Sequence, residues 1–413
     1  MPSIPSTRMN ALERRASLAL AGLFACRMLG LFLLLPVFAV AVQGVPGGSD
    51  PARVGLALGM YGLTQAVLQI PFGLASDRWG RKPIVITGLV MFIIGSLVCT
   101  FAEDILWITI GRALQGAGAI SAAITAWLAD VTRDEVRTKA MAMVGGAIGL
   151  AFAVSLVGAP LLVGLGGLTG LFWAISVLGV AALVVALWWI PLPPPRAATP
   201  IMAQTPARAV LAQPDLWRFN VGVFVLHLVQ VALFVVVPGL LARTGGLAAA
   251  ELWKVYLPVI LVSFVFMVPV IFAAERRGAH RQALLAAVVG LTLTLGLLPW
   301  ASQGFGTLVV ALVAFFVMFN VLEALQPSIV SRLAPPAFKG LALGFYNTAQ
   351  AAGLFVGGAL GGWLAATQGD ARVFEACAVL AAVWLLLAWR MRPLPAPGAS
   401  RVDDVGEVEA SRV

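Results

Sequence analysis

Four ionisable side chains lie deep within long apolar stretches of this chain, where a charge is costly. They are Arg27, Arg112, His227 and Glu323. A charged residue at the centre of a membrane span costs roughly 2.5–3.5 kcal/mol on insertion scales, and such residues often mark a proton or ion pathway. Glu323 is the only carboxylate that is deep in any of these stretches. Because a carboxyl group can bind and release a proton, Glu323 is the candidate proton carrier.

His227 and Glu323 are predicted to lie at the same depth. His227 follows Arg218 by nine residues, and Glu323 precedes Arg332 by nine residues. At 1.5 Å per residue, both side chains would lie roughly 13 Å from the same edge. Opposed helices can bring them together as a coupled titrating pair. Two simpler interpretations stay open: a hydrogen-bonded core histidine, and a permanently neutral Glu323 that bonds across helices.

Uncharged polar side chains form two further stripes in apolar surroundings. Tyr61, Gln65 and Gln69 are spaced four residues apart, so a helix would present them on one face. Tyr346 and Gln350 repeat this spacing. Such stripes either make hydrogen bonds between helices or line a polar cavity, and the sequence favours neither. The candidate cavity residues are Tyr61, Gln65, Gln69, Gln115, Asn320, Tyr346 and Gln350.

The elements that carry these residues are predicted to be membrane-spanning helices. The chain is 61% hydrophobic and 11% charged, with a mean hydropathy of +0.97, whereas soluble domains are about 25% charged. Lipid is therefore the expected solvent for most of the chain, and each span needs about 20 apolar residues. The predicted spans are 16–43, 52–76, 83–102, 104–130, 138–165, 168–191, 217–242, 252–274, 281–301, 305–331, 338–366 and 371–391.

The longest polar interruption, 191–216, separates two sets of six spans. It opens with the proline-rich sequence PLPPPRAATP and is typical of a linker. The tail after Arg392 is short and acidic towards its end, and we expect it to be disordered. The predicted organisation is a cytoplasmic N-terminal segment 1–15, a six-helix bundle 16–191, a linker 192–216, a second six-helix bundle 217–392 and a cytoplasmic tail 393–413.

Basic residues are concentrated on one side of the predicted membrane. The loops on that side, together with both termini, hold 21 Lys and Arg residues, while the opposite loops hold four. This bias places both termini in the cytoplasm. It also accounts for the net charge of +9 without a nucleic acid partner, for which the chain shows no zinc-ligand spacing and no basic segments interleaved with aromatics.

Segments of the first half recur in the second half at an almost constant offset. IPFGLASDRWGR (70–81) aligns with VPVIFAAERRGA (268–279) at an offset of 198, and KAMAM (139–143) aligns with KGLAL (339–343) at an offset of 200. The tetrapeptides LLLP and VVVP are a third match. The repeat indicates two related bundles, a transporter design that places the substrate site at their interface near the membrane midplane.

The charged turn between the second and third spans resembles a signature of the major facilitator superfamily. That signature is G-x-L-a-D-r-x-G-r-k, and its counterparts here are Gly73, Asp77, Arg78, Gly80, Arg81 and Lys82, with Ala75 in place of the leucine. RALQGAGA, which begins at Arg112, resembles the motif R-x-x-q-G-x-g in span four of the same family. The segments RMLGLFLLLPV and FNVLEALQPS are similar to one subgroup, the YajR-type proton-driven drug antiporters.

The resemblance implies an all-α integral membrane protein with twelve transmembrane helices in two pseudo-symmetric six-helix bundles. It further implies a monomeric transporter of the bacterial inner membrane that exports drug-like or lipophilic small molecules in exchange for protons. About 20 residues follow Arg392, so the additional cytosolic domain of the subgroup is not expected. Span five has GAPLLVG (158–164) where antiporters of the family often have G-P-x-x-G-G. A proton-coupled symporter that imports a small metabolite is therefore the alternative.

The resemblance also suggests roles for individual charged residues. Arg112 would be an electrostatic partner of the proton step, and Arg27 would either take part in coupling or pack the two halves together. In the charged turn, Asp77 would accept hydrogen bonds at the N-terminus of span eleven when the transporter faces outward. Arg81 and Asp130 would join this latch.

No motif for a nucleotide, cofactor or metal site is present, and the three cysteines are scattered without paired spacing. We therefore expect no cofactor, and an ion gradient must supply the energy. Two function classes outside transport are the remaining alternatives. A membrane enzyme would need catalytic groups clustered near one interface, and the sequence shows none. A lipid scramblase would need a polar groove that faces lipid, which a sequence does not reveal.

Overall fold

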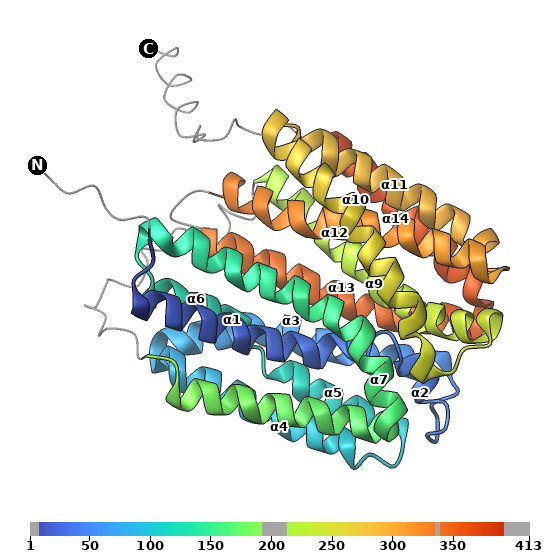
Figure 1. Ribbon diagram of the computed structural model, residues 1–413, viewed down its shortest axis with the longest axis horizontal. Helices are drawn as coiled ribbons and strands as arrows, with labels where there is room; N and C mark the ends of the chain where they lie inside the picture. The colour runs from blue at the N-terminus through green and yellow to red at the C-terminus, as the bar shows by residue number, and fades with distance from the viewer. Residues whose placement is uncertain (1–7, 192–212, 335–338, 392–413) are drawn as a thin grey trace, which may run out of the picture.

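The computed structural model describes residues 8–191, 213–334 and 339–391, and helices account for most of them. In Figure 1 the helices α1–α7 form one group and the helices α9–α14 form a second group. The elements are α1 (Ala11–Phe32), α2 (Phe38–Ala41), α3 (Pro51–Trp79), α4 (Arg81–Thr100), α5 (Ile105–Ala117), α6 (Ser121–Val131), α7 (Asp134–Trp188), α9 (Pro214–Gly245), η1 (Ala249–Glu251), α10 (Trp253–Arg277), α11 (His280–Ala301), α12 (Phe305–Leu333), α13 (Lys339–Gln368) and α14 (Asp370–Trp389).

Ten segments of the described chain are long and apolar enough to cross a membrane as single helices. One of them, α7, covers two crossings, because its backbone leaves helical geometry at Gly166 and at Gly167, where φ is +62°. This break falls between the predicted spans 138–165 and 168–191. The short helices α5 and α6 together supply one more crossing, interrupted at 118–120. The described helices therefore make the twelve crossings that the sequence predicts.

The first helix begins five residues before its predicted span because the sequence supplies a cap. The Asn10 side chain accepts a hydrogen bond from the Glu13 N–H at 2.8 Å, and the Glu13 carboxylate accepts one from the Asn10 N–H at 2.9 Å. This reciprocal pair is a capping box. Glu13 also pairs with Arg133 at 2.7 Å, which ties the start of α1 to the connection between α6 and α7. The hydrogen bond to Glu13 raises the pKa of the Arg133 guanidinium.

The two halves use the same device to join their third and sixth spans. The Lys82 ammonium group donates to the Leu187 carbonyl at 2.6 Å. At the equivalent place 199 residues later, Arg281 donates to the carbonyls of Trp389 and Met391 at 2.8 and 3.0 Å. In both halves a cation at the start of one helix binds free carbonyls at the C-terminal end of another. The internal repeat is thus visible in three dimensions.

The two halves meet along α3 and α13, which pack against each other (Figure 1). Glycine lets the two backbones approach closely: a Cβ added at Gly358 would lie 2.3 Å from the Gly55 carbonyl oxygen. A Cβ added at Gly62 would lie 2.5 Å from the Ala351 carbonyl oxygen. Helix α2 packs against α9, and η1 packs against α7. These contacts lie at the end of the molecule that the distribution of basic residues predicts to be periplasmic.

Towards the predicted cytoplasmic end, the face of α3 that contacts α13 becomes more exposed. Helical spacing extends the contact stripe of α3 from Gly62 to Ile70, Gly73 and Asp77. Ile70 is 43% exposed, and the Asp77 side chain is 58% exposed. Among described residues, only Ala122 of the same half lies within 4 Å of a Cβ added at Gly73. The halves are therefore joined most closely at the predicted periplasmic end.

Several segments named in the sequence predictions lie outside the described residues. They are the first seven positions of the N-terminal segment, positions 192–212 of the linker, the start of span eleven at 338, and the tail 393–413.

The close approach at Gly358 generates a prediction about closure. A Gly358→Ala substitution places a methyl group 2.3 Å from a backbone oxygen, so the joined arrangement should lose stability and the periplasmic ends should separate. Distances between spin labels at Glu103 and Gln303, measured by electron–electron double resonance, should shift to longer values. Gly296→Ala is the matched control, because no heavy atom lies within 4 Å of its added Cβ. Unchanged distances in Gly358→Ala would contradict this description of the contact between α3 and α13.

Candidate functional site

Arg27 lies in the second half of α1, where it is fully buried among neutral acceptors. Its guanidinium donates to Ser121 Oγ at 2.9 Å, to Gln65 Oε1 at 3.1 Å and to the Gly118 carbonyl at 3.2 Å. Gly118 lies in the break between α5 and α6, which leaves its carbonyl accessible to the guanidinium. Arg27 is therefore held by the neighbouring helices of its own half.

Arg112 on α5 is also fully buried. Both Arg112 and Arg27 lie beside the ring of Tyr61. It donates to Gln115 Oε1 at 2.7 Å, and Gln115 in turn donates to Ser96 Oγ at 2.9 Å. The Arg112 guanidinium lies 4.8 Å from the centre of the Tyr61 ring, and that of Arg27 lies 5.6 Å from it. The ring face attracts both cations. Within the described residues no carboxylate pairs with either arginine, so this cluster carries net positive charge.

The second half contains the predicted pair of His227 and Glu323, and the structure confirms that they are close. His227 Nε2 lies 3.6 Å from Glu323 Oε2. His227 Nδ1 lies 3.0 Å from the Val223 carbonyl oxygen, which only accepts hydrogen bonds, so Nδ1 carries a proton. Nε2 lies 2.6 Å from the Gln350 amide nitrogen and accepts from it when the ring is neutral. The same nitrogen therefore faces both an amide donor and a carboxylate.

The two clusters occupy equivalent places in the repeat. Arg27 and His227 are 200 positions apart, and Ser121 and Glu323 are 202 positions apart. The contact between spans one and four in the first half thus recurs between spans seven and ten in the second half, with titratable residues in place of arginine and serine. The described part shows no hydrogen bond or ring contact between the arginine cluster and the His227–Glu323 pair.

Four phenylalanines, which we call the aromatic layer, join the two halves beside this pair. The ring of Phe152 on α7 lies 5.2 Å from that of Phe32 on α1, measured between centroids. It also lies 6.1 Å and 5.8 Å from the rings of Phe316 and Phe319 on α12. The Phe319 ring contacts the His227 ring, with 6.0 Å between centroids. The titratable pair is therefore in direct contact with the residues that connect the halves.

The aromatic layer lies on the predicted periplasmic side of Glu323. Phe316 and Phe319 precede Glu323 on α12 by seven and four residues, or about 10 and 6 Å along the helix. The Glu323 side chain is nevertheless 35% exposed, and its buried Oε2 has no hydrogen-bond partner among described residues. The layer thus separates Glu323 from the joined end of the molecule.

The charged turn between α3 and α4 forms the network that the sequence predicts within its own half. The buried Arg81 guanidinium pairs with Asp77 at 2.5 Å and with Asp130 at 3.0 Å, and it donates to Ser76 Oγ at 2.6 Å. Gly80 has a φ of +95°, which glycine adopts readily, and this allows the tight connection between the helices. The predicted partner of Asp77 at the start of span eleven lies outside the described residues.

Another arginine of this motif lies beside an aromatic ring, and the second half has an equivalent ion pair. The Arg78 guanidinium lies 6.0 Å from the centre of the exposed Trp79 ring. The second half repeats the network in a looser form, because Glu275 lies 3.6 Å from Arg332 and both are exposed. The first half therefore has the more buried network of the two.

In this conformation only some members of the predicted polar stripes connect helices. Gln65 donates to Gln69 of the same helix at 3.4 Å and accepts from Arg27 of α1. Asn320 on α12 donates to Ser263 on α10 at 3.0 Å. The hydroxyls of Tyr61 and Tyr346 have no hydrogen-bond partner among described residues, so the packing and cavity interpretations both stay open. The other buried members of the set are Tyr61, Gln115 and Tyr346.

Sequence reasoning missed the aromatic layer and the serines that bind the buried polar groups. Phenylalanine and serine are common throughout the apolar spans, so neither Phe152 nor Ser96 differs from its neighbours in sequence. The capping box at Asn10 and Glu13 was missed as well, although its residues have the required spacing before an apolar run.

Comparisons with known proteins agree with this architecture. A family model described as "Major Facilitator Superfamily" matches residues 20–353 and 260–413. The inner membrane transport protein YajR of Escherichia coli (strain K12) is 41% identical over 411 residues, which cover 98% of this chain and 89% of the relative. The multidrug resistance protein MdtH of Yersinia pestis (strain Pestoides F) is 27% identical over 351 residues, covering 82% and 83%.

Solved structures with low sequence identity share the fold. The structure of a D-xylose-proton symporter matches with a TM-score of 0.72 at 15% identity, covering 92% of this chain and 98% of that one. The human organic anion transporter MFSD10 matches with a TM-score of 0.65 at 18% identity, covering 92% and 100%.

The geometry of the arginine cluster predicts that Gln115 supports a buried charge. Gln115→Leu removes the hydrogen-bond acceptor of Arg112 and should destabilise the protein by on the order of 2–3 kcal/mol, because a buried charged donor is left without an acceptor. The apparent melting temperature of the purified protein in detergent should fall by several degrees. The exposed residue Gln43 provides the control substitution Gln43→Leu. Equal melting temperatures for the two variants would contradict the assignment.

Proposed function

Because this chain belongs to the major facilitator superfamily and is a multi-pass membrane transporter rather than an enzyme, we propose that it is a proton-coupled antiporter. In this proposal it exports drug-like or lipophilic small molecules across the bacterial inner membrane by alternating access. The observation that carries the proposal is the His227–Glu323 pair, 3.6 Å apart and in contact with the aromatic layer through Phe319.

The pair can hold a proton in two ways. With a neutral ring, His227 Nε2 accepts from Gln350, and a protonated Glu323 needs no ionic partner. An ionised Glu323 would leave Oε2 buried and unpaired, which is costly. If Nε2 also binds a proton, it can no longer accept from the Gln350 amide and can donate to Glu323 instead. Proton uptake and release therefore change which neighbour His227 binds.

Contact with the aromatic layer supplies a link between protonation and closure. Phe319 lies one turn from Glu323 on α12 and packs against both His227 and Phe152 of the other half. A neutral Glu323 is compatible with an apolar seal beside it, whereas an ionised Glu323 favours a hydrated environment. Protonation from the periplasm would thus favour the joined arrangement, and release would take place on the cytoplasmic side; the Glu323 side chain is 35% exposed.

The arginine cluster would act at a distance in this scheme. Arg27 and Arg112 place net positive charge inside the first half without a described carboxylate partner. Charges in a low-dielectric interior interact over longer distances than in water, and through this field the cluster would influence the proton step.

Export of lipophilic compounds is supported by two features. The interior offers few charges besides the residues already described, which suits apolar or weakly cationic substrates. The relative named as a multidrug resistance protein shares 27% of its residues over 82% of this chain. A cationic substrate that contacts Glu323 would compete with the proton, and this differential affinity would couple the two flows.

The decisive variant is Glu323→Gln, which keeps the shape and hydrogen bonding of the side chain but cannot titrate. Uptake of labelled compounds into energised inside-out vesicles should be lost by at least an order of magnitude, because no proton can be exchanged. Substrate binding, and exchange between substrate pools, should survive. Glu375→Gln on α14 is the control, since Glu375 is an exposed carboxylate paired with Arg372.

Two outcomes of that experiment would refute parts of the proposal. Proton-driven transport by Glu323→Gln equal to wild type from about pH 6 to about pH 8, the range in which histidine titrates, would show that Glu323 carries no proton. Accumulation that follows the proton gradient into right-side-out vesicles would show symport rather than antiport.

A further prediction concerns the charged turn between α3 and α4. We propose that Asp77 acts as a latch that binds the start of span eleven when the transporter faces outward, and in the present conformation its side chain is largely exposed. Asp77→Asn should favour the inward-facing state and slow turnover while expression in the membrane stays normal. Glu103→Gln, an exposed substitution at the opposite end, is the control. Normal transport by Asp77→Asn would leave the charges of this turn with a role in topology alone.

A further inference from the structure

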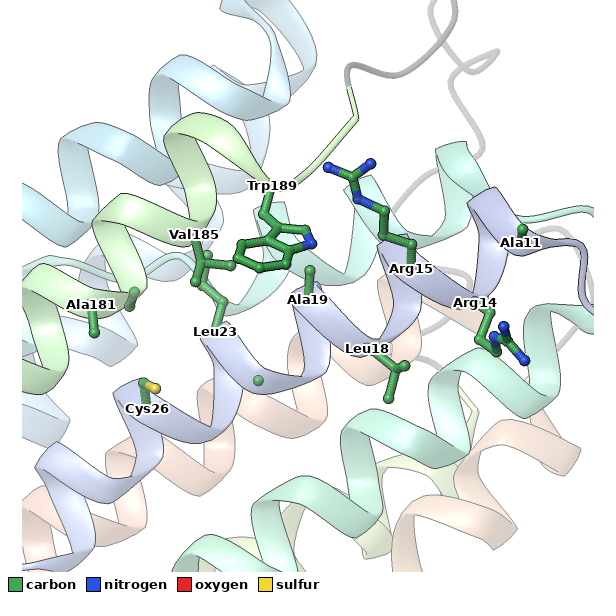
Figure 2. Close-up of a pocket in the computed structure, with 12 residues that line it drawn as sticks. Ala11, Arg14, Arg15, Leu18, Ala19, Leu23, Cys26, Ala181, Val185 and Trp189 are labelled. Carbon is green, nitrogen blue, oxygen red and sulfur yellow. The ribbon is translucent and has the colours of Figure 1, made fainter.

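A groove of about 550 Å³ runs between α1 and the last part of α7, away from the proposed proton site. Figure 2 shows that Leu18 and Leu23 on α1, Val185 on α7 and Trp189 directly after α7 border it. The residues from α1 recur every three or four positions, so one continuous face of the helix forms one wall. The floor is open at Gly22, where a Cβ would meet no heavy atom within 4 Å.

The mouth of the groove is basic. Arg14 and Arg15 line it and are both exposed, and the neighbouring Glu13 is occupied by its contact with Arg133. In the described part of the chain, neither Arg14 nor Arg15 has an ion-pair partner. Figure 2 shows that Arg15 extends from α1 on the side of Trp189, whereas Arg14 extends from the other side of the helix, so two cations without an ion-pair partner among described residues flank the basic end of the groove.

The depth of the groove matches one leaflet of a membrane. Arg15 and Cys26, which lines the far end, are eleven residues apart, or about 16 Å along the helix. Half of a hydrocarbon core that is roughly 30 Å thick is about 15 Å. Trp189 is 58% exposed at the basic end, as expected for an aromatic residue at the membrane–water interface.

From these observations we propose that the groove binds one anionic glycerophospholipid of the cytoplasmic leaflet. The phosphate group pairs with Arg15, Arg14 adds positive charge at the same end of α1, and one acyl chain lies in the groove over Gly22 towards Cys26. Basic pockets between helices on the cytoplasmic side are a recognised way to hold anionic lipid head groups. A soluble partner would not explain why charge and apolar depth are arranged along the membrane normal. The proposal does not depend on the transport mechanism or on proton coupling.

Two variants separate the head-group and acyl-chain parts of the site. The double variant Arg14→Gln/Arg15→Gln removes the charge, and its control is Arg276→Gln/Arg277→Gln, an exposed arginine pair at the end of α10. Gly22→Leu places a side chain in the groove at a position where an added Cβ meets no heavy atom within 4 Å. Its control is Gly296→Leu on α11, which is equally open and exposed.

The probe is phosphatidylglycerol added to the purified full-length protein in detergent, with phosphatidylcholine as the neutral comparison. Native mass spectrometry should show one phosphatidylglycerol retained by wild type and by both controls. The double arginine variant should retain it at least about tenfold less, since each basic residue near a lipid surface contributes about one kcal/mol. Gly22→Leu should retain none. A phosphatidylglycerol with a photoreactive acyl chain should crosslink to the peptides that contain Leu18–Cys26 and Ala181–Trp189.

Three results would overturn the proposal. Equal retention of phosphatidylglycerol by wild type and both groove variants would show that the lipid binds elsewhere. Equal retention of the neutral lipid by wild type would remove the role of the two arginines. Failure of wild type to retain any lipid, with no crosslink to α1 or α7, would show that another segment or molecule occupies the groove.

Discussion

The cost of placing an ionised group out of contact with water governs how this chain is arranged. At equivalent positions, the two halves surround their buried ionisable groups with different residues. In the first half, amide and hydroxyl oxygens accept from Arg27, Gln115 accepts from Arg112, and the Tyr61 ring lies beside both guanidinium groups. In the second half, a histidine and a carboxyl group, His227 and Glu323, lie 3.6 Å apart. The first half thus places two arginines where the second half has a pair that, in our proposal, exchanges a proton.

The fold places this variable charge where it can affect the contact between the halves. The backbones of α3 and α13 touch through glycines, and the aromatic layer continues the contact towards the membrane centre. Beyond the layer lies Glu323, so the boundary between the closed and the accessible part of the molecule passes beside it. A seam built from backbone contacts and rings can separate and re-form without breaking ionic bonds. Alternating access needs a seam of this kind.

Sequence alone predicted the features that depend on contact with lipid. Hydropathy located the twelve crossings, including the division of α7 at Gly166 and Gly167, and depth along the helices predicted that His227 and Glu323 would meet. It could not predict which neighbours satisfy Arg27, because any buried acceptor at the right depth would serve. Nor could it predict which end of the molecule is closed, since one sequence encodes both arrangements of an alternating-access transporter.

The central claim is that Glu323 changes its protonation state while in contact with His227. Infrared difference spectroscopy of the protein in liposomes, recorded as pH is raised, reports the carbonyl stretch of a protonated carboxyl group. The account predicts a band that disappears with increasing pH and is absent in Glu323→Gln. A spectrum in which wild type and Glu323→Gln lose the same carboxyl band would contradict it.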